Sequence, residues 1–214
     1  HGNQTNPDIA ALNTGGFVVV WEGYSNRNFF DRSGKGVYAR VYGDEGNPSN
    51  CVSGQSDYNS TWTYEAFCPK TDDVLVNVTT AGDQYAPTVT HTVCHVPMGE
   101  ASCSLGAVDG GFVVSWTSDG ADDDGPGIHA QRFDEVGNTM AGANFIDNVN
   151  LINDYQDDSQ YWSTVVTREH HTEFQPDANR NALKGDLYHA WVSSTQHQVG
   201  YTDPKPSLYA KYTE

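Results

Sequence analysis

The sequence has few positive charges, no long apolar run and no segment with the periodicity of a helix. It contains 11 Lys and Arg against 28 Asp and Glu, which gives a formal net charge of -17. A field of this sign repels a phosphate backbone, so the charge argues against nucleic acid as a partner and favours divalent cations or solubility in salt. No segment approaches the roughly 20 apolar residues of a membrane helix, so we expect no membrane span. The lack of helical periodicity predicts an all-β chain.

The usual motifs of hydrolytic enzymes are also missing. There is no Gly-x-Ser-x-Gly elbow, and the segment at 118–120 does not complete the Ser-x-Asp-x-Gly-x-x-Trp box of sialidases. The dense titratable cluster that contains imidazole is Glu169, His170 and His171. A carboxylate pair for glycoside hydrolysis stays open, because separation in space cannot be read from a sequence. We therefore expect a protein that is not an enzyme, with a glycosidase as the less favoured alternative.

Cysteine is scarce, and its four positions form two local pairs. Cys51 and Cys68 lie in one segment, and Cys94 and Cys103 lie in another. Four cysteines permit three connectivities, of which the sequential one is favoured because each pair lies within one insertion. The absence of a CxxC spacing, and of His at zinc-finger distance, argues against a structural zinc site.

Three sequons for N-linked glycosylation accompany the cysteines. They begin at Asn3, Asn59 and Asn77. Paired cysteines and sequons together predict an oxidising, secreted setting, extracellular or at a cell surface, with N-linked glycans. The first residue is His1 rather than Met, which indicates a processed or trimmed chain.

What the sequence does contain is a repeated pair of phrases. Gly-Gly-Phe-Val-Val-Val-Trp at 15–21 returns as Gly-Gly-Phe-Val-Val-Ser-Trp at 110–116. A second phrase follows each copy, and a third, degenerate copy of both phrases lies near the end of the chain; these segments are 37–42, 128–133, 187–191 and 208–212. Internal repetition at a long period is typical of a modular β architecture.

Each repeat reads as four antiparallel strands. A Gln-x-x-Pro or Gln-x-x-Ser lead-in precedes the first strand, a turn with glycines follows it in the first two units, and the Val-rich second strand is predicted to be buried on both faces. The first strands are expected at 8–12, 88–93 and 164–167, the third strands at 36–42 and 127–133, and the fourth strands at 74–79 and 144–150. The chain is then a single repeat domain of three units, at approximately 1–82, 83–152 and 153–214.

Four antiparallel strands with a hydrophobic centre describe a propeller blade. We therefore predict three tandem, four-stranded, propeller-blade-like units with insertions at 50–70, 94–108 and 169–184. The two disulfides would staple the first two insertions. Ordinary propellers have about four to eight blades, so three units must form a compact triangular or linear stack, or complete their packing against other subunits.

The last unit is expected to be incomplete. Its third strand closes at Glu214, which leaves eleven expected strands where three full units would have twelve. A missing edge strand leaves unpaired backbone groups that invite pairing with another chain. The alternative is that the natural sequence continues beyond this segment.

The phrases at 15–21, 36–42 and 83–89 resemble a tandem repeat of large secreted and surface proteins from bacteria and some microbial eukaryotes. That repeat reads Gln-x-x-Pro-x-Val, Gly-Gly-Phe-Val-Val-x-Trp, an Asp- and Gly-rich loop, Val-Tyr-Ala-Gln-Arg-Phe-Asp and x-x-Gly-Asn, often beside haemolysin-type calcium-binding and cadherin-like modules. Residues 119–138 match it closely, whereas the third unit keeps only Trp191 and 208–210. The resemblance implies an extracellular, non-catalytic surface role. The cysteines and insertions depart from the bacterial pattern and favour a specialised eukaryotic or environmental relative.

An acidic loop between the second and third strands of the second unit is the candidate metal site. Its carboxylates belong to Asp119, Asp122, Asp123 and Asp124. Oxygen-rich, glycine-bent loops suit calcium, although this loop lacks the EF-hand spacing. The alternative is a solvated acidic turn. The equivalent loop of the first unit contains one Asp and several cations, which argues against a calcium site in every unit.

Aromatic residues divide into two sets. Trp21, Trp116 and Trp191 end the Val-rich strand of each unit, where packing in the core is favoured over sugar stacking. Aromatics in expected loops are the candidates for assembly or glycan contact: Phe29, Phe30, Trp62, Tyr64 and Phe67.

These features favour a secreted structural protein that assembles with copies of itself into a fibre or surface array, through exposed strand edges and loop aromatics. The alternative is a calcium-dependent carbohydrate-binding or adhesion module.

Overall fold

The structure is a computed structural model that describes residues 3–12, 15–24, 34–43, 71–92, 111–122, 125–140, 150–152, 159–168, 186–193 and 207–213. Every helix or strand assigned in these ranges is a β-strand, which confirms the all-β prediction. None of the described segments forms a helix that is long and apolar enough to cross a membrane.

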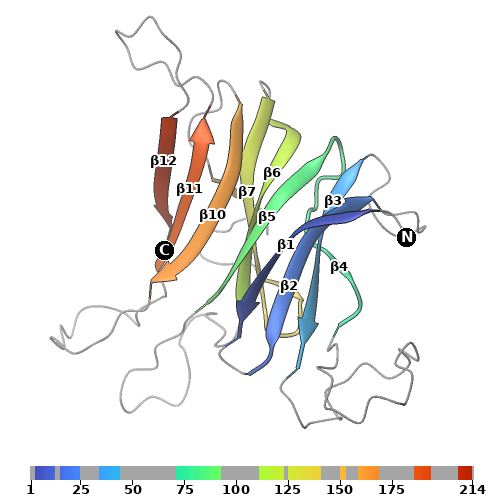
Figure 1. Cartoon of the computed structure of the whole chain (residues 1–214). Coiled ribbons are helices and arrows are strands. Elements are labelled where there is room, and N and C mark those ends of the chain that lie inside the picture. Colours follow the sequence, from blue (N-terminus) through green and yellow to red (C-terminus); the bar gives the residue numbers. More distant parts are fainter. Residues whose placement is uncertain are drawn as a thin grey trace, which may run out of the picture.

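The strands form three antiparallel sheets, one for each repeat (Figure 1). Sheet 1 contains β1 (Gln4–Ala11), β2 (Phe17–Tyr24), β3 (Lys35–Tyr42) and β4 (Val74–Leu75) in that order. Sheet 2 contains β5 (Gln84–His91), β6 (Phe112–Asp122), β7 (Gly125–Phe133) and, along the outer edge of β7, β8 (Thr139–Met140) and β9 (Asn150–Leu151). Sheet 3 contains β10 (Gln160–Arg168), β11 (Asp186–Ser193) and β12 (Ser207–Thr213).

The fourth strand of sheet 1 is shorter than the sequence predicts, and residues 144–149 of the fourth strand expected in sheet 2 lie outside the described residues. In sheet 1, β4 ends at Leu75, although the N–H of Val76 still donates to the carbonyl of Val37 at 2.9 Å. In sheet 2 the outer edge of β7 is shared by two short segments, and Ile152 N–H donates to the Ile128 carbonyl at 2.7 Å. In both sheets, described residues thus pair along the outer edge of the third strand.

The Gln-x-x-Pro or Gln-x-x-Ser lead-in belongs to the first strand, whereas the sequence predicts that this strand begins after it. Each lead-in contains one extra residue relative to its partner strand, between Thr5 and Asp8 in sheet 1, with the same shift in sheets 2 and 3. This is a β-bulge. The third residue of each lead-in, Asn6, Ala86 and Trp162, has a left-handed backbone with φ of 51°, 51° and 50°. A left-handed backbone is uncommon outside glycine, so its occurrence in all three units marks the bulge as a shared feature of the repeat's geometry.

The three sheets pack face to face, and sheet 2 lies between the other two (Figure 1). We call the face that bears Trp21, Trp116 or Trp191 the front face of its sheet, and the opposite face its back face. The back face of sheet 1 packs on the front face of sheet 2 in a core that includes Val18, Val20, Val37, Ala39, Val41, Val89, Phe112, Val114, Trp116 and Phe133. The back face of sheet 2 packs on the front face of sheet 3 through Val113, Ile128, Ala130, Ile152, Val165, Leu187 and Trp191.

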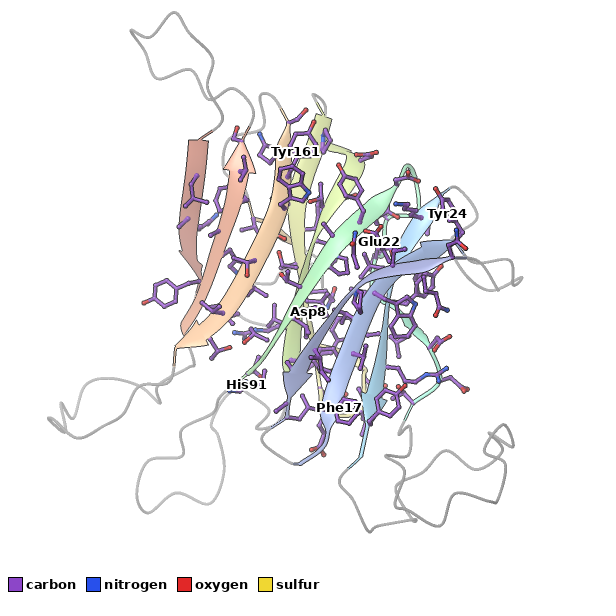
Figure 2. All side chains as sticks on the ribbon, viewed as in Figure 1. Asp8, Phe17, Glu22, Tyr24, His91 and Tyr161 are labelled. Carbon is purple, nitrogen blue, oxygen red and sulfur yellow. The ribbon has the colours of Figure 1, made fainter. Side chains whose placement is uncertain are left out.

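The position of each sheet explains the burial of its second strand. From Phe112 to Ser118, β6 is buried on both faces, as its continuous hydrophobicity predicts, because it has a sheet on either side. In β2, from Phe17 to Glu22, the residues of the back face are buried and those of the front face are half-buried. The first strands β1, β5 and β10 lie side by side, and side chains fill the space between the sheets (Figure 2).

Candidate functional site

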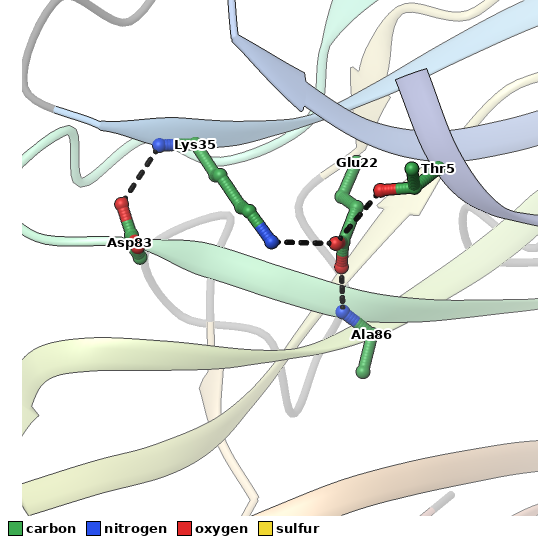
Figure 3. Close-up of polar contacts among 5 residues, drawn as sticks. All are labelled: Thr5, Glu22, Lys35, Asp83 and Ala86. Atoms are coloured by element: carbon green, nitrogen blue, oxygen red, sulfur yellow. Dashed lines mark hydrogen bonds and ion pairs between the residues drawn. The ribbon is translucent and has the colours of Figure 1, made fainter. Parts of the chain in front are cut away.

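The contact between sheets 1 and 2 is organised around one buried carboxylate (Figure 3). Glu22 lies on the back face of β2, directly after Trp21, and is almost fully buried. Its Oε1 accepts hydrogen bonds from Lys35 Nζ at 2.9 Å and from Thr5 Oγ1 at 3.0 Å. Its Oε2 accepts one from the backbone N–H of Ala86 at 2.7 Å. Since Ala86 is the left-handed residue of the β5 bulge, the bulge presents a backbone donor to the neighbouring sheet, and Glu22 receives it.

These donors decide the charge of Glu22. Burial by itself raises the pKa of the carboxyl, but the hydrogen bonds from Ala86, Lys35, Asn6 and Thr5 outweigh burial and hold the pKa below its usual value. The same ion pair raises the pKa of Lys35. Both groups are therefore charged at neutral pH. A buried charge pair with further hydrogen bonds is costly to break on one side, because the remaining charge loses its partner.

The contact between sheets 2 and 3 repeats this arrangement with a neutral acceptor. The N–H of Trp162, the left-handed residue of the β10 bulge, donates to Thr117 Oγ1 at 3.2 Å. Thr117 follows Trp116 as Glu22 follows Trp21, and it is fully buried. In both cases, a polar side chain after the strand tryptophan binds the bulge N–H of the next unit. We call this contact the bulge joint.

Side chains of the preceding sheet also bind backbone N–H groups on the free edges of β5 and β10. Asp8 Oδ2, from β1, accepts the N–H of Val89 in β5 at 2.9 Å. The hydroxyls of Thr90 in β5 and Thr167 in β10 lie 3.1 Å apart, and Thr167 N–H donates to Thr90 Oγ1 at 3.3 Å. An edge strand with unpaired backbone groups tends to pair with another chain. Here polar side chains from the adjacent sheet occupy that edge.

The predicted sequon residue Asn77 is part of the connection between sheets 1 and 2. It is only 3% exposed, and its Oδ1 accepts the N–H of Val37 at 2.8 Å. Its Nδ2 donates to the Thr79 carbonyl and to Gln84 Oε1, each at 2.9 Å. N-linked glycosylation uses this nitrogen, so a glycan would have to replace a buried hydrogen bond and pass through the core. Asn3, in contrast, is exposed, and Asn59 lies outside the described residues.

One member of the predicted calcium loop has a described side chain. Asp119 lies near Asp83 and is hydrogen-bonded to Tyr85. Burial raises the pKa of Asp119, the charge of Asp83 adds to the rise, and the hydrogen bond from Tyr85 opposes it. The side chain of Asp122, and Asp123 and Asp124 entirely, lie outside what is described, so calcium binding stays a prediction.

Part of that acidic segment is strand rather than loop. β6 continues to Asp122, which pairs with Gly125 at the start of β7, after an irregularity that begins at Ser118. Among the residues that the structure describes, no three His, Cys, Asp or Glu side chains form a group that could hold a metal ion.

The remaining predicted site residues fall in segments that are not described. They are Cys51, Cys68, Cys94, Cys103, Phe29, Phe30, Trp62, Tyr64 and Phe67. The imidazole cluster at 169–171 is also outside the described residues. The proposed disulfides and loop contacts therefore remain predictions.

The strand tryptophans confirm the core interpretation for two units. Trp116 and Trp191 are buried at the two inter-sheet contacts, and Trp116 stacks on His129 with ring centroids 5.9 Å apart. Trp21 is half-buried and stacks on Tyr38 at 6.2 Å. The front face of sheet 1, which bears Trp21, is therefore partly accessible to solvent.

Sequence reasoning missed the bulge joint, a polar contact that recurs at both inter-sheet contacts. The two acceptors, Glu22 and Thr117, share a position but differ in residue type, and the donors are backbone groups. The signal available in the sequence is positional: a polar residue directly after the strand tryptophan, together with the third residue of the next lead-in.

No known protein family matches the chain, and no curated protein or solved structure resembles it at a significant level. The bulge joint shows how one unit contacts the next, and among the described residues the outer faces of sheets 1 and 3 are covered by no further sheet.

Proposed function

We propose that the protein is a non-enzymatic, secreted structural protein, a subunit of an extracellular fibre or surface array that is built from copies of itself. The edge of sheet 3 is the observation that supports this proposal most strongly. The outer edge of β3 pairs with β4, and that of β7 pairs with β8 and β9, whereas β12 pairs only with β11 among the described strands. An open strand edge offers N–H and C=O groups to a strand of another copy.

We further propose that the units are arranged like propeller blades, which suits the same function. Each sheet is an antiparallel meander, successive sheets pack face to face, and the first strands lie together on one side of the stack. In the proposed arrangement these first strands are the innermost strands of consecutive propeller blades. Three blades do not close an ordinary ring, so further packing requires units from another copy. The proposed disulfides, Cys51 with Cys68 and Cys94 with Cys103, would staple the insertions outside this core.

The proposed setting is extracellular. Paired cysteines and sequons suit an oxidising compartment, and glycans at Asn3 and Asn59 would keep a repetitive surface hydrated. The net charge of -17 opposes close approach of copies at low salt, and calcium or dissolved salt would screen that repulsion.

Among the described residues, the most deeply buried carboxylate, that of Glu22, has structural partners, which favours a non-catalytic role. Glu22 accepts hydrogen bonds from Lys35, Thr5 and Ala86, which leaves little capacity for a substrate. A general acid or base needs access to the proton that it transfers.

A calcium-dependent carbohydrate-binding module is the second candidate, and the front face of sheet 1 favours it. Two stacked aromatic pairs, Phe17 with Tyr42 and Trp21 with Tyr38, lie on this face. Aromatic faces of this kind stack on sugars. Binding to a glycan array that is lost with a chelator would support this candidate.

Electron microscopy separates the two candidates. We expect negatively stained protein, at high concentration and with calcium, to form filaments or ordered arrays. Particles that remain single copies under these conditions would contradict the structural proposal. Glycan binding by such single copies would support the carbohydrate-binding candidate instead.

A further inference from the structure

The two internal contacts of the stack use the same pair of surfaces. In each, the back face of one sheet receives the front face of the next, and the positions involved are equivalent. Val37 on the back face of sheet 1 corresponds to Ile128 on the back face of sheet 2, and both are fully buried. The alanines that follow on the same face, Ala39 and Ala130, are also fully buried. The repeat thus has one preferred mode of docking, which the chain realises twice.

The back face of sheet 3 has the composition of a docking surface but no sheet covers it among the described residues. Leu208 occupies the position of Val37 and Ile128, and it is 76% exposed where they are 0% exposed. Ala210, at the position of Ala39 and Ala130, is exposed as well. Val166, Tyr188 and Val192 extend the same apolar face. Contiguous apolar surface on the outside of a protein marks an interaction site.

The front face of sheet 1 is the matching surface at the other end. Ile9 is 60% exposed, whereas its equivalents Val89 and Val165 are 7% and 3% exposed. Phe17 and Trp21 are half-buried, whereas Phe112 and Trp116 at the same positions in sheet 2 are fully buried.

A stacked aromatic pair on the front face of sheet 1 has the same geometry as the pair at the internal contact between sheets 1 and 2. Phe17 stacks on Tyr42 with centroids 4.8 Å apart and an interplanar angle of 12°. The equivalent pair that packs on sheet 1, Phe112 and Phe133, has values of 5.0 Å and 13°. The outer face of sheet 1 therefore presents a stacked aromatic pair at the same positions, and with the same mutual geometry, as the face that sheet 1 itself receives from sheet 2.

We infer that these two outer faces bind each other between copies, so that the front face of sheet 1 in one copy docks on the back face of sheet 3 in the next. This inference rests on the proposed self-assembly and names its interface. Both faces belong to the same chain, and each is the counterpart of the other in the two contacts that the chain already makes. The contact is heterologous, so it extends into a filament or closes when two copies complete a six-unit ring.

One position distinguishes this interface from the internal ones. Val192 follows Trp191 at the position of Glu22 and Thr117, and it has no hydrogen-bond acceptor in its side chain. The bulge N–H of Asn6 in the next copy therefore receives no side-chain acceptor there. Apolar packing alone holds this point of the contact, so association between copies is weaker than the contact between units.

Two charge substitutions on exposed residues test the pairing of faces in the full chain. Leu208→Glu places a charge on the back face of sheet 3, and Ile9→Glu places one on the front face of sheet 1. Both side chains are exposed, so neither substitution should prevent folding. Sedimentation velocity should show that each variant alone is a single copy. An equimolar mixture should form a dimer and nothing larger, because each variant keeps one intact face. Val136→Glu, on an exposed turn away from both faces, is the matched control and should assemble like the parent protein.

A gain-of-function variant completes the test. Val192→Thr restores the acceptor of the bulge joint with little change of shape, and it should lower the dissociation constant between copies by about 2- to 10-fold, the effect of one net hydrogen bond. If both Glu variants assemble as the parent does, the faces are wrong while self-assembly stands. If the parent itself stays a single copy, the proposed function fails, and this interface fails with it.

Discussion

The carboxylate of Glu22 and the backbone N–H of Ala86 lie 2.7 Å apart and join two sheets that belong to different repeats. The N–H is available because Ala86 is the left-handed residue of a β-bulge. Thr117 and Trp162 form the same joint between the next two sheets. The β-bulge of one unit therefore supplies the backbone N–H that a side chain of the preceding unit binds.

Removing the charge of Glu22 should destabilise the fold. Glu22→Gln keeps the shape of the side chain but replaces one acceptor oxygen with an NH₂ group. This NH₂ group then faces other donors, either those of Lys35 and Thr5 or the N–H of Ala86. We expect a loss of about 2–4 kcal/mol in the free energy of unfolding, since a buried charge loses its partner. Urea denaturation measures this loss. Glu135→Gln on the turn between β7 and β8 is the control and should change stability by less than about 0.5 kcal/mol.

The neutral joint should contribute less. Thr117→Val preserves the shape and leaves the N–H of Trp162 without its acceptor, so we expect a loss of about 1–2 kcal/mol. Thermal unfolding followed by circular dichroism measures it. A loss equal to that of Glu22→Gln would contradict the account, because charge would then add nothing to the first joint.

Asn77 should carry no glycan in the folded protein. Its Nδ2 is buried and donates both hydrogens to acceptors within the protein, Thr79 and Gln84. Peptide mass spectrometry of the secreted protein should find Asn77 unmodified and Asn3 modified. Asn77→Ala should cost about 2–4 kcal/mol, because it leaves buried partners unsatisfied. A glycopeptide that contains modified Asn77 would show that the connection between sheets differs from the one described.

The fold should lose stability as the pH falls from about 6.5 toward 4, because of two buried histidines. Burial lowers the pKa of His129 from 6.5 to about 4. Burial, with the charges of Lys211 and Arg132, lowers the pKa of His189 to about 4 as well. The unfolded chain therefore binds more protons in this range, so the stability present above pH 6.5 is lost on acidification, by up to about 3 kcal/mol for each histidine.

Unfolding free energies measured between pH 7 and about pH 4 test this dependence. His129→Phe keeps the stack on Trp116 and should remove about half of the slope. A parent protein with constant stability over this range would contradict the assignment of buried, neutral imidazoles.

The sequence predicts much of this fold because its repeats carry hydrophobic patterns that strands require. The continuous hydrophobic run that ends at Trp116 predicts a strand buried on both faces, and that is its place in the middle sheet. The bulges are harder to predict, since Asn6, Ala86 and Trp162 share a left-handed backbone but no chemical property. A glycine there would have given a signal, whereas three unrelated residue types give none.

The candidate site was less accessible to sequence reasoning for a related reason. A joint between units depends on which face a residue occupies, and a one-residue bulge changes that face. The repeated phrase shows that Glu22 and Thr117 are equivalent, but it does not show that their partners are the bulge N–H groups of Ala86 and Trp162 in the next unit. Burial of Asn77 could not be predicted either, because its sequon reads like that of an exposed asparagine until its partners Val37 and Gln84 are placed.

The central claim is that copies of this chain bind one another, and the mass of the protein in solution as a function of concentration tests it most directly. Sedimentation equilibrium with calcium, over a wide concentration range, should give an average mass that rises well above that of one copy, which is 23.4 kDa plus any glycans. A mass that stays at the value of one copy over the whole range would contradict the account.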